Sequence, residues 1–130
     1  MIPTSTGAAI ATTEVLTQLK GKFDGLAVRV PVQDVSLTDF VFLLKKKATV
    51  EEINMAFTRA SKDKRLKGIL GVTNEQLVSS DFIGSNYSAV VDLSLTKVID
   101  GDLVQVIAWY DNEWGYSQRL IDMAVLIGKK

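Results

Sequence analysis

A chain of 130 residues is long enough for one domain with its own core, and 47% hydrophobic against 23% charged residues is ordinary for a folded protein. Fifteen basic and fifteen acidic residues cancel to zero formal charge, which gives no electrostatic reason to expect nucleic acid or an anionic membrane as a partner. The sequence contains neither Cys nor His, which excludes disulfides, thiolate metal sites and catalysis by cysteine or histidine within these residues.

Membrane and metal signals are also missing from the sequence. No apolar run approaches the roughly 20 residues that a membrane-spanning helix needs, and residues 1–5 lack the basic and apolar regions of a signal peptide. The acidic residues are scattered without metal-ligand spacing. We therefore expect a cytoplasmic protein with no metal and no membrane partner, formed by a single domain over residues 1–130.

The first part of the chain predicts one helix and two strands. Hydroxyl residues precede apolar residues at helical spacing, which predicts a helix from about Ser5 to Leu19. Residues 26–30 alternate as a strand does, and Pro31 limits pairing at that end. A longer strand is predicted over 35–46 with both faces apolar, so it is either central in its sheet or covered by another subunit.

The middle of the chain predicts a helix and a short strand. Thr49 and Glu52 are spaced as a capping box, in which each side chain bonds the backbone N–H of the other residue. The helix that follows carries an apolar stripe for burial, made of Val50, Ile53, Phe57 and Ala60. After a charged connection over 61–67, residues 68–72 predict a strand.

The last part of the chain predicts a hairpin and a helix. Strands over 88–99 and 103–110 are joined at Asp100-Gly101, a dipeptide suited to the positive φ of a tight turn. The final helix is expected from about 114 to 127, and its inner face would carry Leu120, Met123, Ala124 and Ile127. The order of elements indicates an α+β fold with a mixed, largely antiparallel sheet and about three helices on one face.

Three segments are candidates for chemistry, and each also has a purely structural interpretation. Residues 4–9 form a helix start, where free N–H groups and hydroxyls either bind an anion or only cap the helix. Arg29 interrupts an apolar strand, so we expect either a carboxylate partner or a ligand anion. Residues 109–117 are an aromatic strand-to-helix junction with an Asp/Asn cap, in which Asn112 is able to orient a ligand amide or hydroxyl.

Taken together, the motifs resemble the C-terminal, catalytic half of phosphorylating glyceraldehyde-3-phosphate dehydrogenase. The resemblance covers essentially the whole chain, in the family's order and at plausible spacing. It rests on Ile-Pro-Thr-Ser-Thr-Gly-Ala-Ala at 2–9, Gly-Leu-Ala-Val-Arg-Val-Pro at 25–31, Lys-Gly-Ile-Leu-Gly at 67–71, Val-Ser-Ser-Asp-Phe at 78–82 and Trp-Tyr-Asp-Asn-Glu-Trp-Gly-Tyr-Ser at 109–117.

The resemblance implies a reaction and roles for five residues. In that family a Cys attacks the aldehyde of glyceraldehyde 3-phosphate, a hydride passes to NAD or NADP, and inorganic phosphate releases the acyl group. Thr6 and Gly7 would bind the attacking phosphate, and Arg29 would bind phosphate as well. Asn112 would hydrogen-bond the nicotinamide carboxamide, with Tyr116 beside it. The resemblance also implies a homo-oligomer, because the family's sheet packs against other subunits through the face away from the helices.

The resemblance also implies what this chain does not do. The family's Cys and His precede the Ile-Pro-Thr-Ser-Thr-Gly segment at which this sequence begins, as does its nucleotide-binding domain. We therefore expect no catalytic residue and no cofactor in the fragment, but at best weak binding of inorganic phosphate or sulfate. The alternatives are a folding or oligomerisation scaffold without a ligand and a half-enzyme that complements its missing part.

Four residues depart from what the family resemblance leads us to expect. Ile10 stands where the family commonly has Lys, and the others lie near segments where Pro or small residues are usual. They suggest the hypothesis of an excised and engineered domain, with polar substitutions for solubility. The four residues are Ile10, Gln33, Asp34 and Gln76.

Overall fold

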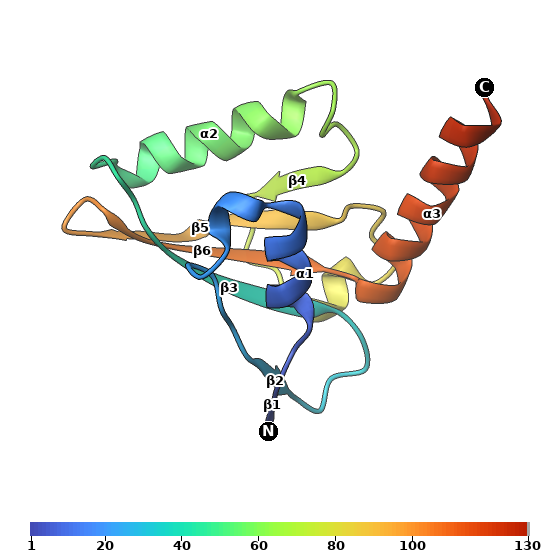
Figure 1. The fold of residues 1–130 in the computed structure, drawn as a ribbon, viewed down its shortest axis with the longest axis horizontal. Helices are drawn as coiled ribbons and strands as arrows, with labels where there is room; N and C mark the ends of the chain where they lie inside the picture. The colour runs from blue at the N-terminus through green and yellow to red at the C-terminus, as the bar shows by residue number, and fades with distance from the viewer. Residues whose placement is uncertain (130) are drawn as a thin grey trace. The chain divides into compact units, whose positions relative to one another are not determined.

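A computed structural model describes residues 1–129 of the chain (Figure 1). The chain divides into two compact units, Met1–Gln33 and Asp34–Lys130. The single domain expected over residues 1–130 stays a prediction. Within the described residues, no helix combines the length and the apolar character needed to cross a bilayer.

The first unit consists of a short ribbon and a short helix. Strand β1 (Ile2–Thr4) pairs antiparallel with β2 (Ala27–Arg29), so that Ile2 lies opposite Arg29. Helix α1 (Ala8–Val15) is shorter than predicted and is followed by the 3-10 helix η1 (Thr17–Leu19). Ala9 is the one buried residue of α1. Because helices in proteins depend mainly on tertiary packing, this small amount of burial explains why α1 is shorter than its spacing predicted.

A four-stranded sheet forms the centre of the second unit. The strand order is β3-β6-β5-β4; β4 pairs parallel with β5, and the other pairs are antiparallel. The mixed, largely antiparallel sheet and the helices confirm the predicted α+β class. The strands are β3 (Ser36–Leu43), β4 (Leu70–Thr73), β5 (Ala89–Ile99) and β6 (Leu103–Tyr110).

The hairpin between β5 and β6 has the predicted turn. Asp100 and Gly101 have φ values of 49° and 81°, so both are in the left-handed region that the Asp-Gly dipeptide tolerates. The strands pair up to Ile99 and Leu103. The turn therefore accounts for the register next to the hairpin, whereas an irregularity between Asp92 and Lys97 shifts the register of the more distant pairs.

Helix α2 (Val50–Lys62) packs on one face of this sheet, as Figure 1 shows. Its predicted capping box is confirmed: the Thr49 hydroxyl accepts from the Glu52 N–H at 3.3 Å, and the Thr49 N–H donates to the Glu52 carboxylate at 2.9 Å. Ile53 and Phe57 from the apolar stripe pack against the main core. The buried residues of that core are Val91, Leu93, Val104, Val106 and Ala108.

Strand β3 lies at the edge of the sheet, so of the two alternatives for its apolar faces, a central strand is wrong. Both of its faces carry apolar side chains, as predicted, but the two faces differ in exposure. Phe40 packs against the core under α2, whereas Val41 and Leu43 on the other face are 63% and 78% exposed. Cover of this second face by another subunit stays a prediction.

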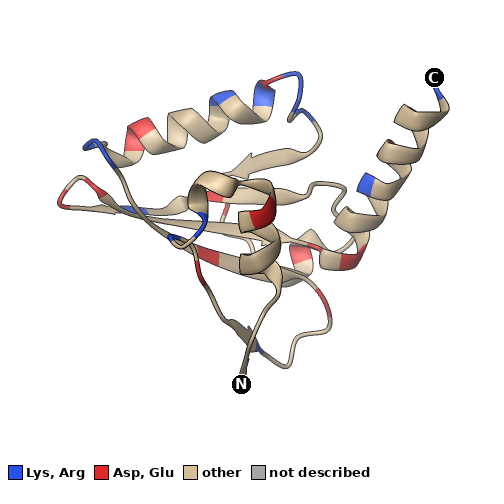
Figure 2. Ribbon diagram, in the orientation of Figure 1, with Lys and Arg blue, Asp and Glu red and all other residues tan. Residues whose placement is uncertain are grey.

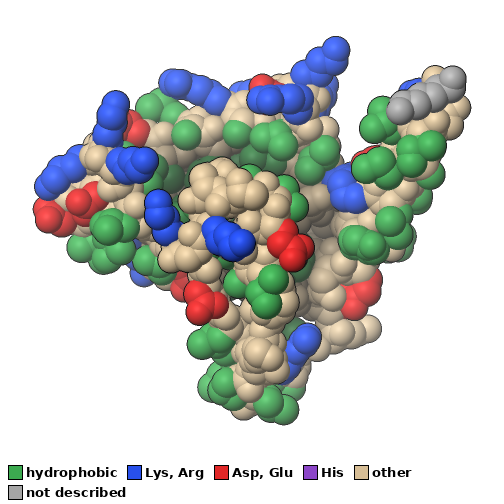
Figure 3. All heavy atoms as spheres, viewed as in Figure 1, with side chains coloured by type: hydrophobic (Ala, Val, Ile, Leu, Met, Phe, Trp, Pro, Cys, Tyr) green, Lys and Arg blue, Asp and Glu red, His purple; other side chains and the backbone are tan. Residues whose placement is uncertain are grey.

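Helix α3 (Asn112–Gly128) begins two residues before its predicted start. The expected inner face is wrong, because Leu120, Met123, Ala124 and Ile127 are all exposed. Gly115 is the buried residue of this helix. Apolar residues occur on every side of the segment from 120 to 127, so their spacing did not identify a buried face. Figure 3 shows hydrophobic side chains along its surface.

Candidate functional site

The start of α1 offers hydrogen-bond donors to an anion. The Thr6 hydroxyl oxygen accepts from the Ala8 N–H at 3.1 Å, but the N-cap residue of α1 is Gly7, so the helix lacks the side-chain cap that the sequence predicted. Other N–H groups in the first turn of a helix have no partner within the helix. No atom lies within 4 Å of the position that a Cβ on Gly7 would take, so the approach to this turn is open.

The environment of Arg29 differs from the one that its sequence context predicted. Arg29 is exposed at the end of a strand of three residues, so its guanidinium remains in contact with solvent and is not desolvated as expected. No ion pair joins Arg29 to an acidic residue within residues 1–129. The structural interpretation, a carboxylate partner, is therefore wrong for the described chain.

The three predicted phosphate ligands lie in one unit, with Thr6 and Gly7 adjacent in the chain and Arg29 on the neighbouring strand. Thr6 follows the Thr4 end of β1, whereas Arg29 pairs with Ile2 at the other end. At about 3.4 Å per extended residue, the four steps from Ile2 to Thr6 span at most roughly 14 Å. A phosphate that contacts both Thr6 and Arg29 therefore needs the long Arg29 side chain to fold back along the ribbon.

In the second unit, α3 places Asn112 and Tyr116 side by side. They are four residues apart in one helix, and side chains at this spacing share a helix face. The Ser36 hydroxyl donates to Asn112 Oδ1 at 3.2 Å, which leaves the two N–H groups of Nδ2 free to donate. Tyr116 is 65% exposed. The pair fits a ligand carbonyl, such as that of a carboxamide.

Asp111 begins α3 and confirms the predicted Asp/Asn cap. Its carboxylate accepts from the Trp114 N–H and from the Gly84 N–H, each at 2.8 Å, and the residue is 3% exposed. Oxygen atoms of Asp34, Asp111 and Glu113 lie within 4.8 Å of one another, a group that the sequence did not indicate. Because Asp111 already uses both oxygens for backbone N–H groups, its position is explained without an ion.

A cavity of about 410 Å³ lies between the turn after α2 and the side of α3, within the second unit. The sequence did not indicate this cavity, because residues 61–67 predicted only a charged connection. The cavity is lined by Lys64, Arg65 and Lys67 from that turn and by Arg119 from α3. The N–H of Arg65 and then its guanidinium hold the pKa of the Asp63 carboxyl below its ordinary value.

Comparison with known proteins gives a consistent result. A family model described as "Glyceraldehyde 3-phosphate dehydrogenase, C-terminal domain" matches residues 1–112. "Glyceraldehyde-3-phosphate dehydrogenase 2" of Trichormus variabilis is 53% identical over 130 residues, which is 100% of this chain and 38% of that protein. Glyceraldehyde-3-phosphate dehydrogenase of Streptomyces coelicolor is 52% identical over 130 residues, 100% of this chain and 39% of that protein.

A chloroplastic relative shows the same pattern. A glyceraldehyde-3-phosphate dehydrogenase of Arabidopsis thaliana is 55% identical over 127 residues, which is 98% of this chain and 32% of that protein. The chain thus spans between 32% and 39% of the length of these three relatives.

Proposed function

The chain belongs to the glyceraldehyde-3-phosphate dehydrogenase family, as its C-terminal domain, and we propose from this membership that it supplies phosphate-binding and cofactor-orienting residues to an NAD(P)-dependent oxidoreductase. The observation that carries the proposal is the family match together with the open helix start at Thr6 and Gly7. These residues would bind the inorganic phosphate that releases the acyl group in the family reaction.

The chemistry of the donors supports this role. First-turn N–H groups and the positive end of a helix favour an anion, and Arg29 adds an unpaired guanidinium suited to phosphate oxygens. In the second unit, the Nδ2 group of Asn112 is free to donate to the nicotinamide carboxamide. When bound, that cofactor would accept the hydride from the substrate.

A phosphate titration tests the binding role. We expect the backbone amide resonances of Thr6 and Gly7 to shift and saturate in tens of millimolar inorganic phosphate, because the few donors present support only weak binding. Substitution of Arg29 by Gln is expected to weaken binding about threefold to tenfold. The matched control is Arg59→Gln, which removes an exposed positive charge from α2. Unchanged Thr6 and Gly7 resonances would contradict the proposal.

We further propose that these 130 residues do not catalyse the reaction alone, because they contain no Cys to attack the aldehyde and no His to activate it. A complementing half-enzyme is the second candidate, and the exposed apolar side chains of α3 favour it, since they suit a further protein segment. We expect no reduction of NAD by the chain with glyceraldehyde 3-phosphate. Activity should appear after addition of the N-terminal part of the Trichormus relative. Reduction by the chain alone would contradict the first statement, and no activity after mixing would contradict the second.

The hypothesis of an engineered origin stays a proposal. Gln33 and Gln76 are exposed, as substitutions for solubility would be, but Ile10 is an apolar residue that is 67% exposed. Asp34 uses its carboxylate to accept from the Val35 N–H at 2.6 Å. Comparison with the parent gene tests the hypothesis. If the parent gene encodes the same residue at all four positions, the hypothesis is wrong.

A further inference from the structure

The cavity between the turn after α2 and α3 carries an excess of positive charge. Figure 2 shows the basic residues of the turn and of α3 on the two elements that border it, and Figure 3 shows basic side chains of both on one visible face. Two of the four cations are paired: Arg65 with Asp63 at 3.2 Å and Arg119 with Asp122 at 2.8 Å. Lys64 and Lys67 have no ion pair within residues 1–129. The excess is local, because the whole chain has a formal charge of zero.

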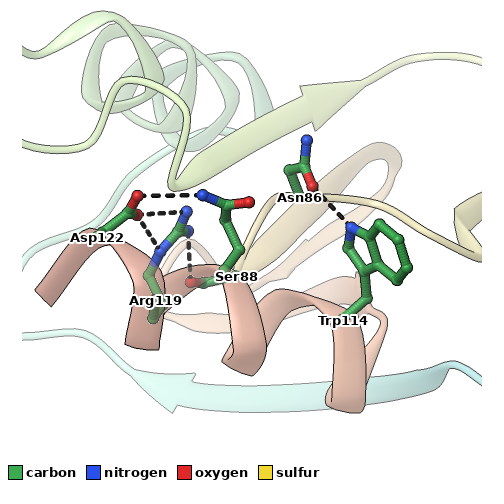
Figure 4. A network of polar contacts seen from close by, with 6 residues as sticks. Asn86, Ser88, Trp114, Arg119 and Asp122 are labelled. Atoms are coloured by element: carbon green, nitrogen blue, oxygen red, sulfur yellow. Dashed lines mark hydrogen bonds and ion pairs between the residues drawn. The ribbon is translucent and has the colours of Figure 1, made fainter. Parts of the chain in front are cut away.

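The guanidinium of Arg119 is held in place at one wall of the cavity (Figure 4). Its Nε and Nη2 atoms both donate to Asp122 Oδ2 at 2.8 Å, and Nη1 donates to the Ser88 hydroxyl oxygen at 3.0 Å. A guanidinium has five N–H groups, so two remain free after these contacts. A donor that is already positioned loses little conformational entropy when a ligand binds.

The one carboxylate that lines the cavity is occupied. Asp122 Oδ2 accepts from Arg119, and Oδ1 accepts from Gln118 Nε2 at 3.1 Å. The charge of this carboxylate is thus largely matched by Arg119, and the lysines that remain favour an anion in the cavity.

The orientation of Asn86 adds a neutral donor. Its Oδ1 atom accepts from the Trp114 indole N–H at 2.7 Å, as Figure 4 shows. With the carbonyl oxygen committed to the indole, Nδ2 keeps two N–H groups for a ligand. The same contact couples the Trp114 indole to any change at Asn86, which gives a spectroscopic reporter at the cavity.

We propose that this cavity binds a small phosphate compound carrying two or more negative charges, through Lys64, Lys67 and the free N–H groups of Arg119 and Asn86. Its volume of about 410 Å³ falls in the range of roughly 300 to 1,000 Å³ that is usual for small-molecule sites, so it holds more than a single inorganic phosphate. Lysines contact phosphate as point charges and the guanidinium by directed N–H groups. The site lies in the second unit and does not depend on the proposed phosphate site at Thr6 and Gly7.

Inorganic pyrophosphate is a suitable probe, titrated at constant ionic strength into the full chain. We expect the Trp114 indole N–H resonance to shift and saturate at millimolar pyrophosphate. The Trp109 indole is an internal control, because it donates to the buried Asp92 carboxylate at 3.3 Å and should not move. An unchanged Trp114 resonance would overturn the proposal, as would equal shifts of both indoles.

Charge-matched variants separate a site from general attraction. Replacement of both Lys64 and Lys67 by Gln should weaken pyrophosphate binding about tenfold. Replacement of both Lys45 and Lys46 by Gln removes the same charge from exposed residues elsewhere in this unit and should change binding less than twofold. Equal weakening in the two double variants would overturn the proposal.

A further variant distinguishes this site from the first one. Arg29→Gln should leave the Trp114 response unchanged, even if phosphate no longer shifts Thr6 and Gly7. A response that disappears with Arg29→Gln would overturn the second site. A single-stranded oligonucleotide that shifts Trp114 at lower concentration than pyrophosphate would also overturn it, because the ligand would then be a nucleic acid.

Discussion

At the scale of single residues, Gly115 shows how closely α3 approaches the rest of its unit. A Cβ on Gly115 would lie 2.7 Å from the carbonyl oxygen of Tyr87, a backbone atom in the segment just before β5. By contrast, a Cβ on Gly128 in the same helix would meet no atom within 4 Å. The close approach is therefore local to the first turns of α3.

We expect Gly115→Ala to destabilise the protein by about 1 to 3 kcal/mol, the usual cost of overpacking. Alanine gains up to about 1 kcal/mol over glycine in a helix, so the clash has to exceed that gain. Gly128→Ala makes the same helical gain without a clash and should be neutral or stabilising. Urea unfolding measures both variants, and a Gly115→Ala protein as stable as the Gly128→Ala protein would show that Tyr87 moves freely.

Residue roles were predictable from the sequence where the partner is near in the chain. The Thr49 and Glu52 box and the Asp111 cap both bond N–H groups three residues away. The exposure of Arg29 was not predictable, because it depends on how β2 pairs with β1, and this pairing covers only three residues. The cavity was missed for a similar reason, since its residues come from separate segments.

At the scale of elements, the local signals identified strands and helices but not their neighbours. Periodicity and the Asp-Gly turn located the hairpin of β5 and β6, because the turn brings its own two strands together. The same periodicity described both faces of β3 without showing that it would lie at the sheet edge. Its position depends on pairing with β6, more than sixty residues later in the chain, as in the pair of Ser36 with Tyr110.

Helix α3 illustrates this limit most clearly. Its Asp111 cap was predicted from the sequence, although its start was predicted two residues too late, and its apolar residues beyond 119 left no unique face to bury. A helix that is apolar on every side usually lies within a larger core. The element therefore suits contact with a further protein segment, in agreement with the half-enzyme candidate.

At the scale of the whole molecule, the sheet face opposite α2 is covered along only part of its length. Near one end, Phe82 stacks on Trp109 with ring centroids 5.4 Å apart, and Val35 and Val90 complete a second core. Towards the hairpin the same face is open. The apolar side chains exposed there are Val41, Leu43, Ile99 and Leu103, at 63%, 78%, 61% and 39%.

We expect a second copy of the chain to cover this open part of the face, since burial of a contiguous apolar patch favours association. At millimolar concentration the mass in solution should exceed the 14.2 kDa of one chain. Val41→Glu combined with Leu43→Glu should restore the monomer, because each carboxylate would lose its hydration at the contact. Charges on an edge strand are well tolerated by the fold itself.

The matched control places the same two charges on α3, as Ile121→Glu with Leu126→Glu, at residues that are 57% and 63% exposed. Light scattering should still show association of this variant if the sheet face is responsible, because α3 then lies outside the contact. If the α3 variant becomes monomeric while the β3 variant remains associated, the copies meet through α3 instead. A wild-type chain that stays monomeric at millimolar concentration contradicts association through either surface, and the open end of the sheet then faces water in the isolated chain.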